Sequence, residues 1–185
     1  MVWKELPMIK SLIGVAALVL TALPGVAATQ EGAKFDCVVT SVPEGAKNSI
    51  GAAMAGGGDE AAREALFQQL ATVTDDCIAR HGIAAEQKSD YFDYSLARIS
   101  REWLVGDISR LNLSTSVVDK ALDFGPTGAN PDLSSEMSEE QIMKIVQAYI
   151  ENGVDIEKVD GAVWEKVGAY AAATSIYWNK RKLLP

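Results

Sequence analysis

The stretch "DEAAREALFQQLATVTDDCIARHG", residues 59–82, contains one of the two cysteines and the only histidine of this 185-residue chain. Its apolar residues recur at steps of four, three and four: Leu66, Leu70, Val73 and Cys77. This spacing is typical of one buried face of an α-helix. Asp59 stands at the position of an N-cap, and Gly82 at the position where a helix commonly ends. The stretch therefore predicts a helix with Cys77 in the core, where a thiol is structural rather than reactive.

The first residues of the chain predict export. A basic start precedes an apolar run, residues 12–23, then a Pro-Gly turn and the small residue Ala28. These features are typical of a secretory signal peptide that is cleaved after Ala28. The run has about twelve apolar residues, fewer than the roughly twenty that span a bilayer, so no stable membrane anchor is expected. The sequence predicts a signal peptide, residues 1–28, followed by a single helical domain, residues 29–185, that is periplasmic or secreted.

The two cysteines are predicted to form one disulfide, Cys37–Cys77. An even number of cysteines in an exported chain most simply indicates disulfide bonding, and two cysteines allow one connectivity. The bond would close a loop of about forty residues and stabilise the folded state by at most roughly 4 kcal/mol. That is a large part of the stability of an ordinary domain.

The residues that bind metals and cofactors are too few for most such sites. His81 lies in the last turn of its predicted helix, where a histidine is favoured by the helix dipole. Zinc needs four ligands, and Cys77 with His81 supplies two. A haem held by His81 and either Met54 or Met143 is a further possibility. A calcium loop starting at Asp155 has lysine where an EF-hand needs glutamate. We expect no cofactor and no metal.

The remaining sequence also predicts helices and no strands, because no long run of alternating polar and apolar residues occurs. The predicted helices cover residues 34–42, 44–55, 59–82, 84–106, 115–124, 138–153 and 161–182. The fold class is therefore all-α: an irregular bundle of about six to seven helices with one disulfide. The C-terminal helix, which is long, is expected to pack through the centre of the bundle or along one wall.

Two of these helices carry specific expectations. In the helix 84–106 the predicted core face consists of Phe92, Leu96, Ile99 and Trp103. This face shifts near Gly106, where a bend or break is expected. In the helix 138–153, Ser138 and Gln141 have the spacing of a capping box. The predicted buried residues of that helix are Ile142, Ile145, Val146 and Tyr149.

The C-terminal helix carries a stripe of aromatic residues at helical spacing: Trp164, Tyr170, Tyr177 and Trp178. Such a stripe most often belongs to the core of a helical protein. It could instead line a ligand pocket, or mark a partner site if more rings face solvent than packing requires. The sequence leaves these alternatives open.

Charge and composition exclude several classes of function. The formal net charge is −8, and without residues 1–28 the chain has 15 basic and 24 acidic residues. No basic patch is present to displace counterions, so we expect binding neither to nucleic acid nor to anionic membranes. A serine hydrolase is also excluded, because no GxSxG motif occurs.

We therefore predict an exported, non-catalytic accessory or binding protein, whose ligand or protein partner the sequence does not identify. The alternative is a small hydrolase of cell-wall glycan that uses an acidic residue such as Glu102. This residue is adjacent to Trp103, and a carboxylic acid against a bulky ring is the arrangement of some glycosidase proton donors. A surface salt bridge with Arg98 or Arg101 is the competing role for Glu102.

Overall fold

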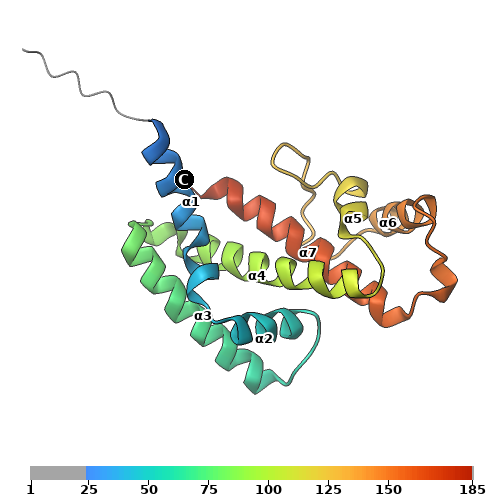
Figure 1. The fold of residues 1–185 in the computed structure, drawn as a ribbon, viewed down its shortest axis with the longest axis horizontal. Helices are drawn as coiled ribbons and strands as arrows, with labels where there is room; N and C mark the ends of the chain where they lie inside the picture. Colours follow the sequence, from blue (N-terminus) through green and yellow to red (C-terminus); the bar gives the residue numbers. More distant parts are fainter. Residues whose placement is uncertain (1–23, 185) are drawn as a thin grey trace, which may run out of the picture.

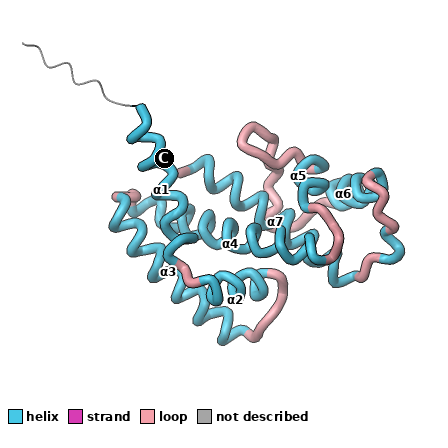
Figure 2. Tube along the Cα trace, viewed as in Figure 1, coloured by secondary structure: helices cyan, strands magenta, loops and turns pink. Residues whose placement is uncertain are grey.

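The structure, a computed structural model, describes residues 24–184, with side chains from residue 32 onward. All regular structure in this range is helical (Figure 2). The α-helices are α1 (Pro24–Ser41), α2 (Glu44–Met54), α3 (Glu60–His81), α4 (Lys88–Arg110), α5 (Thr115–Ala121), α6 (Glu139–Glu151) and α7 (Gly161–Leu183), with two short 3-10 helices, η1 (Ala85–Gln87) and η2 (Ile156–Lys158). The all-α bundle is confirmed for the described residues. The predicted signal peptide lies largely outside them.

Helix α1 is longer than predicted. It begins at Pro24 instead of near residue 34, and it ends at Ser41, just before Pro43. The additional residues include alanine, glutamine and glutamate, which are good helix formers. Proline is well tolerated in the first turn of a helix, because its missing N–H would have no helical partner there. The C-terminal end is as predicted, since a residue before proline is disfavoured in helix.

The ends of three other helices are fixed by capping groups, and the sequence predicts those of α3 and α6. Asp59 Oδ1 accepts a hydrogen bond from the Ala62 amide at 2.8 Å, and α3 ends at Gly82 with φ of 62°. Ser138 and Gln141 form the predicted capping box at the start of α6. Asp160 caps α7, where its Oδ1 accepts a hydrogen bond from the Ala162 amide at 2.8 Å. These local interactions explain why the bounds of these helices follow from the sequence.

Helices α4 and α7 form an antiparallel pair in the middle of the molecule, with α2 and α3 on the other side of α4 (Figure 1). Near the start of α4, Asp90 accepts a hydrogen bond from Lys180 at 2.7 Å. Near its end, Asp107 accepts one from Lys166 at 2.5 Å. The order of these contacts requires that the two helices run in opposite directions.

The pair passes through two hydrophobic cores. The first core joins α1, α2, α3, the first half of α4 and the chain end, and its buried residues include Phe35, Val38, Ile50, Leu70, Tyr91, Tyr94, Ile99 and Leu184. The second core joins the rest of α4 to α5, α6 and α7, and its buried residues include Leu104, Ile108, Val118, Ile145, Tyr149, Val167 and Tyr170. Tyr177 of α7 also packs against the first core. Because both cores contact α4 and α7, these two helices form the frame of the fold.

The disulfide Cys37–Cys77 is present and joins α1 to α3, as predicted. The two Cα atoms lie 5.9 Å apart, and both cysteines are buried in the first core. The bond closes a loop between residues 40 apart in sequence. A loop of this length gives a stabilisation of at most about 4 kcal/mol by restricting the unfolded chain.

The predicted core face of α4 is only partly correct. Ile99 is buried, but Phe92, Leu96 and Trp103 are half-buried. The other fully buried residues of α4 lie on several sides of the helix: Tyr91, Tyr94, Ser95, Ala97, Ser100, Leu104 and Ile108. The reason is that α1, α2, α3 and α7 all pack against α4. A helix covered on several sides has no single apolar stripe.

Of the bend or break predicted near Gly106, the break is wrong, because α4 runs without interruption to Arg110. Leu104 and Ile108 on either side of the glycine are fully buried in the second core. Their packing outweighs the cost of about 1 kcal/mol that a glycine brings to a helix interior.

The predicted buried face of α6 is too wide. Ile145 and Tyr149 are buried, whereas Val146 is half-buried and Ile142 is 45% exposed. Helix α6 lies at one end of the molecule beside α5 (Figure 1). A helix at the edge of a bundle buries a narrower stripe than one between two layers.

Candidate functional site

A cleft of about 530 Å³ lies along the α4–α7 pair. Its volume is within the range of protein sites for small organic molecules. The apolar part of its wall consists of Met54, Leu96, Ala97, Leu104, Ala169, Ala172, Ala173, Ile176 and Leu183. Met54 and Leu183 are also among the exposed large apolar residues of the protein, so this wall continues to the surface.

The cleft exists because short side chains meet between the two helices. Ala97 and Ser100 are about one turn apart on α4, and Ala169 and Ala173 are one turn apart on α7. Side chains this short do not reach across the space between two helices, so a gap remains where longer ones would interdigitate. Ser100 donates its hydroxyl to the carbonyl of Leu96 at 2.8 Å, so this buried hydroxyl is satisfied within α4.

One end of the cleft is polar and contains two ion pairs of Lys180. Lys180 forms salt bridges with Asp90 at 2.7 Å and with Asp93 at 3.0 Å. The hydrogen bond to Asp90 raises the pKa of Lys180 above its ordinary value, and the hydrogen bond to Asp93 raises it further. Asp132 accepts a hydrogen bond from the Ser134 amide at 2.9 Å. This bond lowers the pKa of Asp132, so its carboxylate is charged at neutral pH.

The aromatic stripe of α7 lies on the other flank of the pair, away from the cleft. Tyr170 is fully buried and donates its hydroxyl to Asp119 at 2.8 Å. The ring of Tyr177 stacks on that of Tyr94, with centroids 5.3 Å apart. Trp164 packs edge-on against another ring of the second core. Trp178 packs edge-on against Tyr177. The rings therefore serve helix packing, which is the first of the three alternatives that the sequence leaves open, and none of them lines the cleft.

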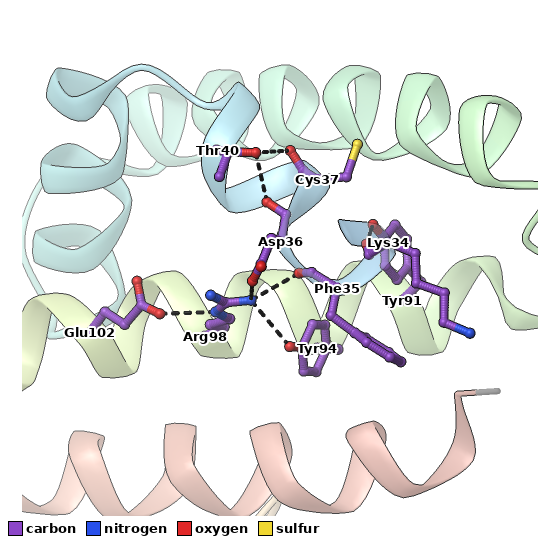
Figure 3. Close-up of polar contacts among 9 residues, drawn as sticks. All are labelled: Lys34, Phe35, Asp36, Cys37, Thr40, Tyr91, Tyr94, Arg98 and Glu102. Carbon is purple, nitrogen blue, oxygen red and sulfur yellow. Dashed lines mark hydrogen bonds and ion pairs between the residues drawn. The ribbon is translucent and has the colours of Figure 1, made fainter. Parts of the chain in front are cut away.

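Arg98 links α4 to α1 through several polar contacts (Figure 3). Its Nη1 donates to the Asp36 carboxylate at 2.7 Å and to the carbonyl of Phe35 at 3.0 Å. Its Nε donates to Glu102 Oε1 at 2.9 Å. Burial would lower the pKa of Arg98, but the hydrogen bonds to Glu102 and Asp36 outweigh burial and raise it. Arg98 therefore attaches α1 to α4 through charged hydrogen bonds, and the disulfide attaches α1 to α3.

Glu102 contacts Arg98 within α4 and makes no polar contact of its own to α1 among the described residues. Its side chain is 48% exposed and its ion-pair partner is Arg98. Arg101, the other predicted partner, instead lies 3.5 Å from Asp119 and donates to the Tyr170 hydroxyl at 3.1 Å. Glu102 also borders a separate hollow of about 230 Å³ beside Trp103. The structure thus places Glu102 in an ion pair within α4, and it does not line the α4–α7 cleft.

The other residues considered for cofactors are dispersed. His81 lies in the last turn of α3, and Met143 is exposed on α6, at the opposite end of the molecule (Figure 1). Met54 lies at the edge of the α4–α7 cleft. Asp155 pairs with Lys158 at 2.7 Å. Among the described residues, no three histidine, cysteine, aspartate or glutamate side chains are grouped in a way that could hold a metal ion.

The cleft is the feature that sequence reasoning missed. Its signal in the sequence is the pair of small residues at helical spacing on each of two helices. This signal becomes informative only when α4 and α7 are known to be neighbours, because either helix alone shows alanines that would also suit close packing. Helix pairing depends on the whole fold, and the sequence pattern of one helix does not encode it.

No known protein family, no curated protein and no solved structure matches this chain. Of the helices that the structure describes, none has the length and apolar character needed to cross a membrane. A function for the chain has therefore to be inferred from the residues of the cleft and from their chemistry.

Proposed function

We propose that this chain is an exported, non-catalytic binding protein that holds a small, largely apolar molecule in the cleft between α4 and α7. The observation that carries the proposal is the cleft itself, about 530 Å³ in volume and lined mostly by apolar side chains. Sites for small molecules commonly combine such walls with a few fixed polar groups that orient the ligand. Asp93, Asp132 and Lys180 supply those groups at one end.

Two further features support export. The N-terminal sequence has the features of a secretory signal peptide, and a buried disulfide such as Cys37–Cys77 persists in oxidising compartments. The proposed location is the periplasm, or the medium if the protein is secreted. The acid of the alternative hypothesis, Glu102, forms an ion pair with Arg98 one turn earlier in α4. This arrangement favours a structural role for Glu102.

Native mass spectrometry of the unreduced protein, isolated from the cell envelope, tests the proposal. We expect a bound small molecule on the wild-type protein and its loss from Ala172→Trp, whose large side chain would occupy the cleft. Ala61→Trp is the matched control, because Ala61 is an exposed position of α3 outside the cleft. Circular dichroism of both variants establishes that they fold. A ligand that survives Ala172→Trp, or a wild-type protein that carries none, would contradict the proposal.

The glycan-hydrolase alternative needs its own measurement. Release of sugar fragments from peptidoglycan is followed for the wild-type protein and for Glu102→Gln, which retains a hydrogen-bond acceptor for Arg98. The binding proposal predicts no release by either protein. Release by the wild type that is lost in Glu102→Gln would establish the hydrolase instead.

A further inference from the structure

The acidic character of the polar end indicates which class of molecule the cleft takes. We propose that the ligand is an amphiphilic organic cation, a hydrocarbon body with one protonated amine or quaternary ammonium head. This inference rests on the proposed function and deepens it. The head would lie beside Asp132 and Asp93, and the hydrocarbon would lie along the small and aliphatic residues further into the cleft.

The polar and apolar residues along the two helices give the cleft one polar end and one apolar end. The polar end contains Asp93 of α4 and Lys180 of α7, which are in direct contact at 3.0 Å. The opposite end contains Leu104 and Ala169, which come later on α4 and earlier on α7. A molecule that fits this arrangement has a polar head at one end and an apolar body at the other. Burial of the apolar body supplies most of the binding free energy, at roughly 25 cal/mol for each Å² removed from water.

The charges at the polar end favour a positive head. The lysine there, Lys180, already has two carboxylate partners, Asp90 and Asp93. Asp132 adds a third carboxylate to the same end, and it makes no salt bridge among the residues that the structure describes. The two acids and one lysine that line this end have a net charge of −1, and Asp90, which pairs with Lys180 outside the lining, brings the total to −2. A cationic head would therefore be attracted, whereas the head of a fatty acid would be repelled.

The field of the whole protein has the same sign. The chain has a formal net charge of −8. An excess of negative charge raises the local concentration of cations and speeds their association, and salt weakens this effect. The local charges at the cleft and the overall charge thus select the same class of ligand.

Calorimetric titration of the disulfide-bonded protein at low salt tests the ligand class. The probes share one chain length and differ in the head: decyltrimethylammonium, decanoate and decyl maltoside, each below the concentration at which it forms micelles. We expect decyltrimethylammonium to bind at least tenfold more tightly than decanoate, with a smaller difference at high salt. Asp132→Asn should weaken the cation about threefold, as expected for an exposed charge pair, and leave decyl maltoside unchanged. Asn retains the Oδ1 acceptor for the Ser134 amide.

Two controls separate this inference from the proposed function. Asp155→Asn removes an exposed acid outside the cleft and should leave all three affinities unchanged. Ala172→Trp should abolish binding, so binding of the cation that survives this substitution is surface adsorption and overturns the inference. If decanoate binds as tightly as the cation, and Ala172→Trp abolishes its binding, the cleft is a binding site but the ligand class is wrong. If none of the probes binds, the inference fails, and the envelope experiment decides separately whether the proposed function fails with it.

Discussion

Gly51 is the residue that allows α2 to approach α4 closely. A Cβ atom built on Gly51 would lie 2.3 Å from Cγ of Trp103, well inside the distance at which carbon atoms repel. The backbone of Gly51 is ordinary helix, so glycine is needed for its lack of a side chain. Trp103 covers the position that a methyl group would otherwise occupy. The close contact between α2 and α4 therefore requires glycine at position 51.

We predict that Gly51→Ala lowers the free energy of unfolding by about 2 kcal/mol, because the added methyl group forces Trp103 or the helix to move. The matched control is Gly45→Ala in the same helix, where a Cβ would meet nothing within 4 Å. That change should raise stability by up to about 1 kcal/mol, the usual effect of replacing glycine by alanine in a helix. Urea denaturation followed by circular dichroism measures both. Equal effects of the two substitutions would refute the role of Trp103.

At the scale of a helix, two serines occupy the same position but do different things. Ser138 precedes α6 and accepts a hydrogen bond from the Gln141 amide at 3.3 Å, while Gln141 Oε1 accepts one from the Ser138 amide at 2.8 Å. Ser114 precedes α5, but its side chain makes no cap and contacts the hydroxyl of Ser116 instead. The capping box should therefore stabilise α6, and the serine before α5 should contribute little.

Ser138→Ala is predicted to lower the free energy of unfolding by about 1 kcal/mol, because an amide at the start of α6 loses its acceptor. Ser114→Ala is predicted to cost less than about 0.5 kcal/mol, since no backbone amide depends on its hydroxyl. Chemical denaturation of the two variants measures the difference. Hydrogen exchange in the first turn of α6 should also speed up in Ser138→Ala. A larger loss for Ser114→Ala than for Ser138→Ala would count against this account.

The helices that were predicted well are those whose ends are defined by neighbouring residues. Asp59 and Gly82 bound α3, and Ser138 begins α6, through contacts within a few positions in sequence. The pairing of Cys37 with Cys77 was also predictable, because two cysteines allow one bond. These features require no knowledge of how distant parts of the chain meet.

Burial and the cleft depend on such distant contacts and could not be predicted in the same way. Ile142 has the spacing of a buried residue of α6 but is 45% exposed, and it borders a small hollow between α6 and α7. Ala97 and Ala173 line the cleft only because α4 and α7 are antiparallel neighbours. The sequence of each helix shows which residues are small or apolar, and the packing of the whole bundle decides what covers them.

At the scale of the molecule, both cores contain buried tyrosines. The rings of Tyr91 and Tyr94 lie in the first core, and that of Tyr149 lies in the second. Their hydroxyl groups reach polar partners: Tyr91 donates to the carbonyl of Lys34, and Tyr149 donates to that of Ser114 at 3.1 Å. Burial raises the pKa of each of these three tyrosines to about 12. The packing of both cores is therefore stable only while the hydroxyl groups of these tyrosines keep their protons.

This dependence predicts a loss of stability at alkaline pH. The unfolded chain releases the tyrosine protons near pH 10, whereas the folded protein holds them until about pH 12. The stabilisation is thus fully present below about pH 10 and falls as pH rises to about 12, by up to about 1.4 kcal/mol per pH unit for each tyrosine. Lysine salt bridges also lose charge in this range, so a variant is needed to isolate the tyrosines. Tyr94→Phe keeps the ring in the first core and removes the hydroxyl. The free energy of unfolding is measured by denaturation from pH 9 to about pH 12. It should fall less steeply with pH in this variant than in the wild type. Equal slopes would show that the Tyr94 hydroxyl does not need to be neutral in the folded protein.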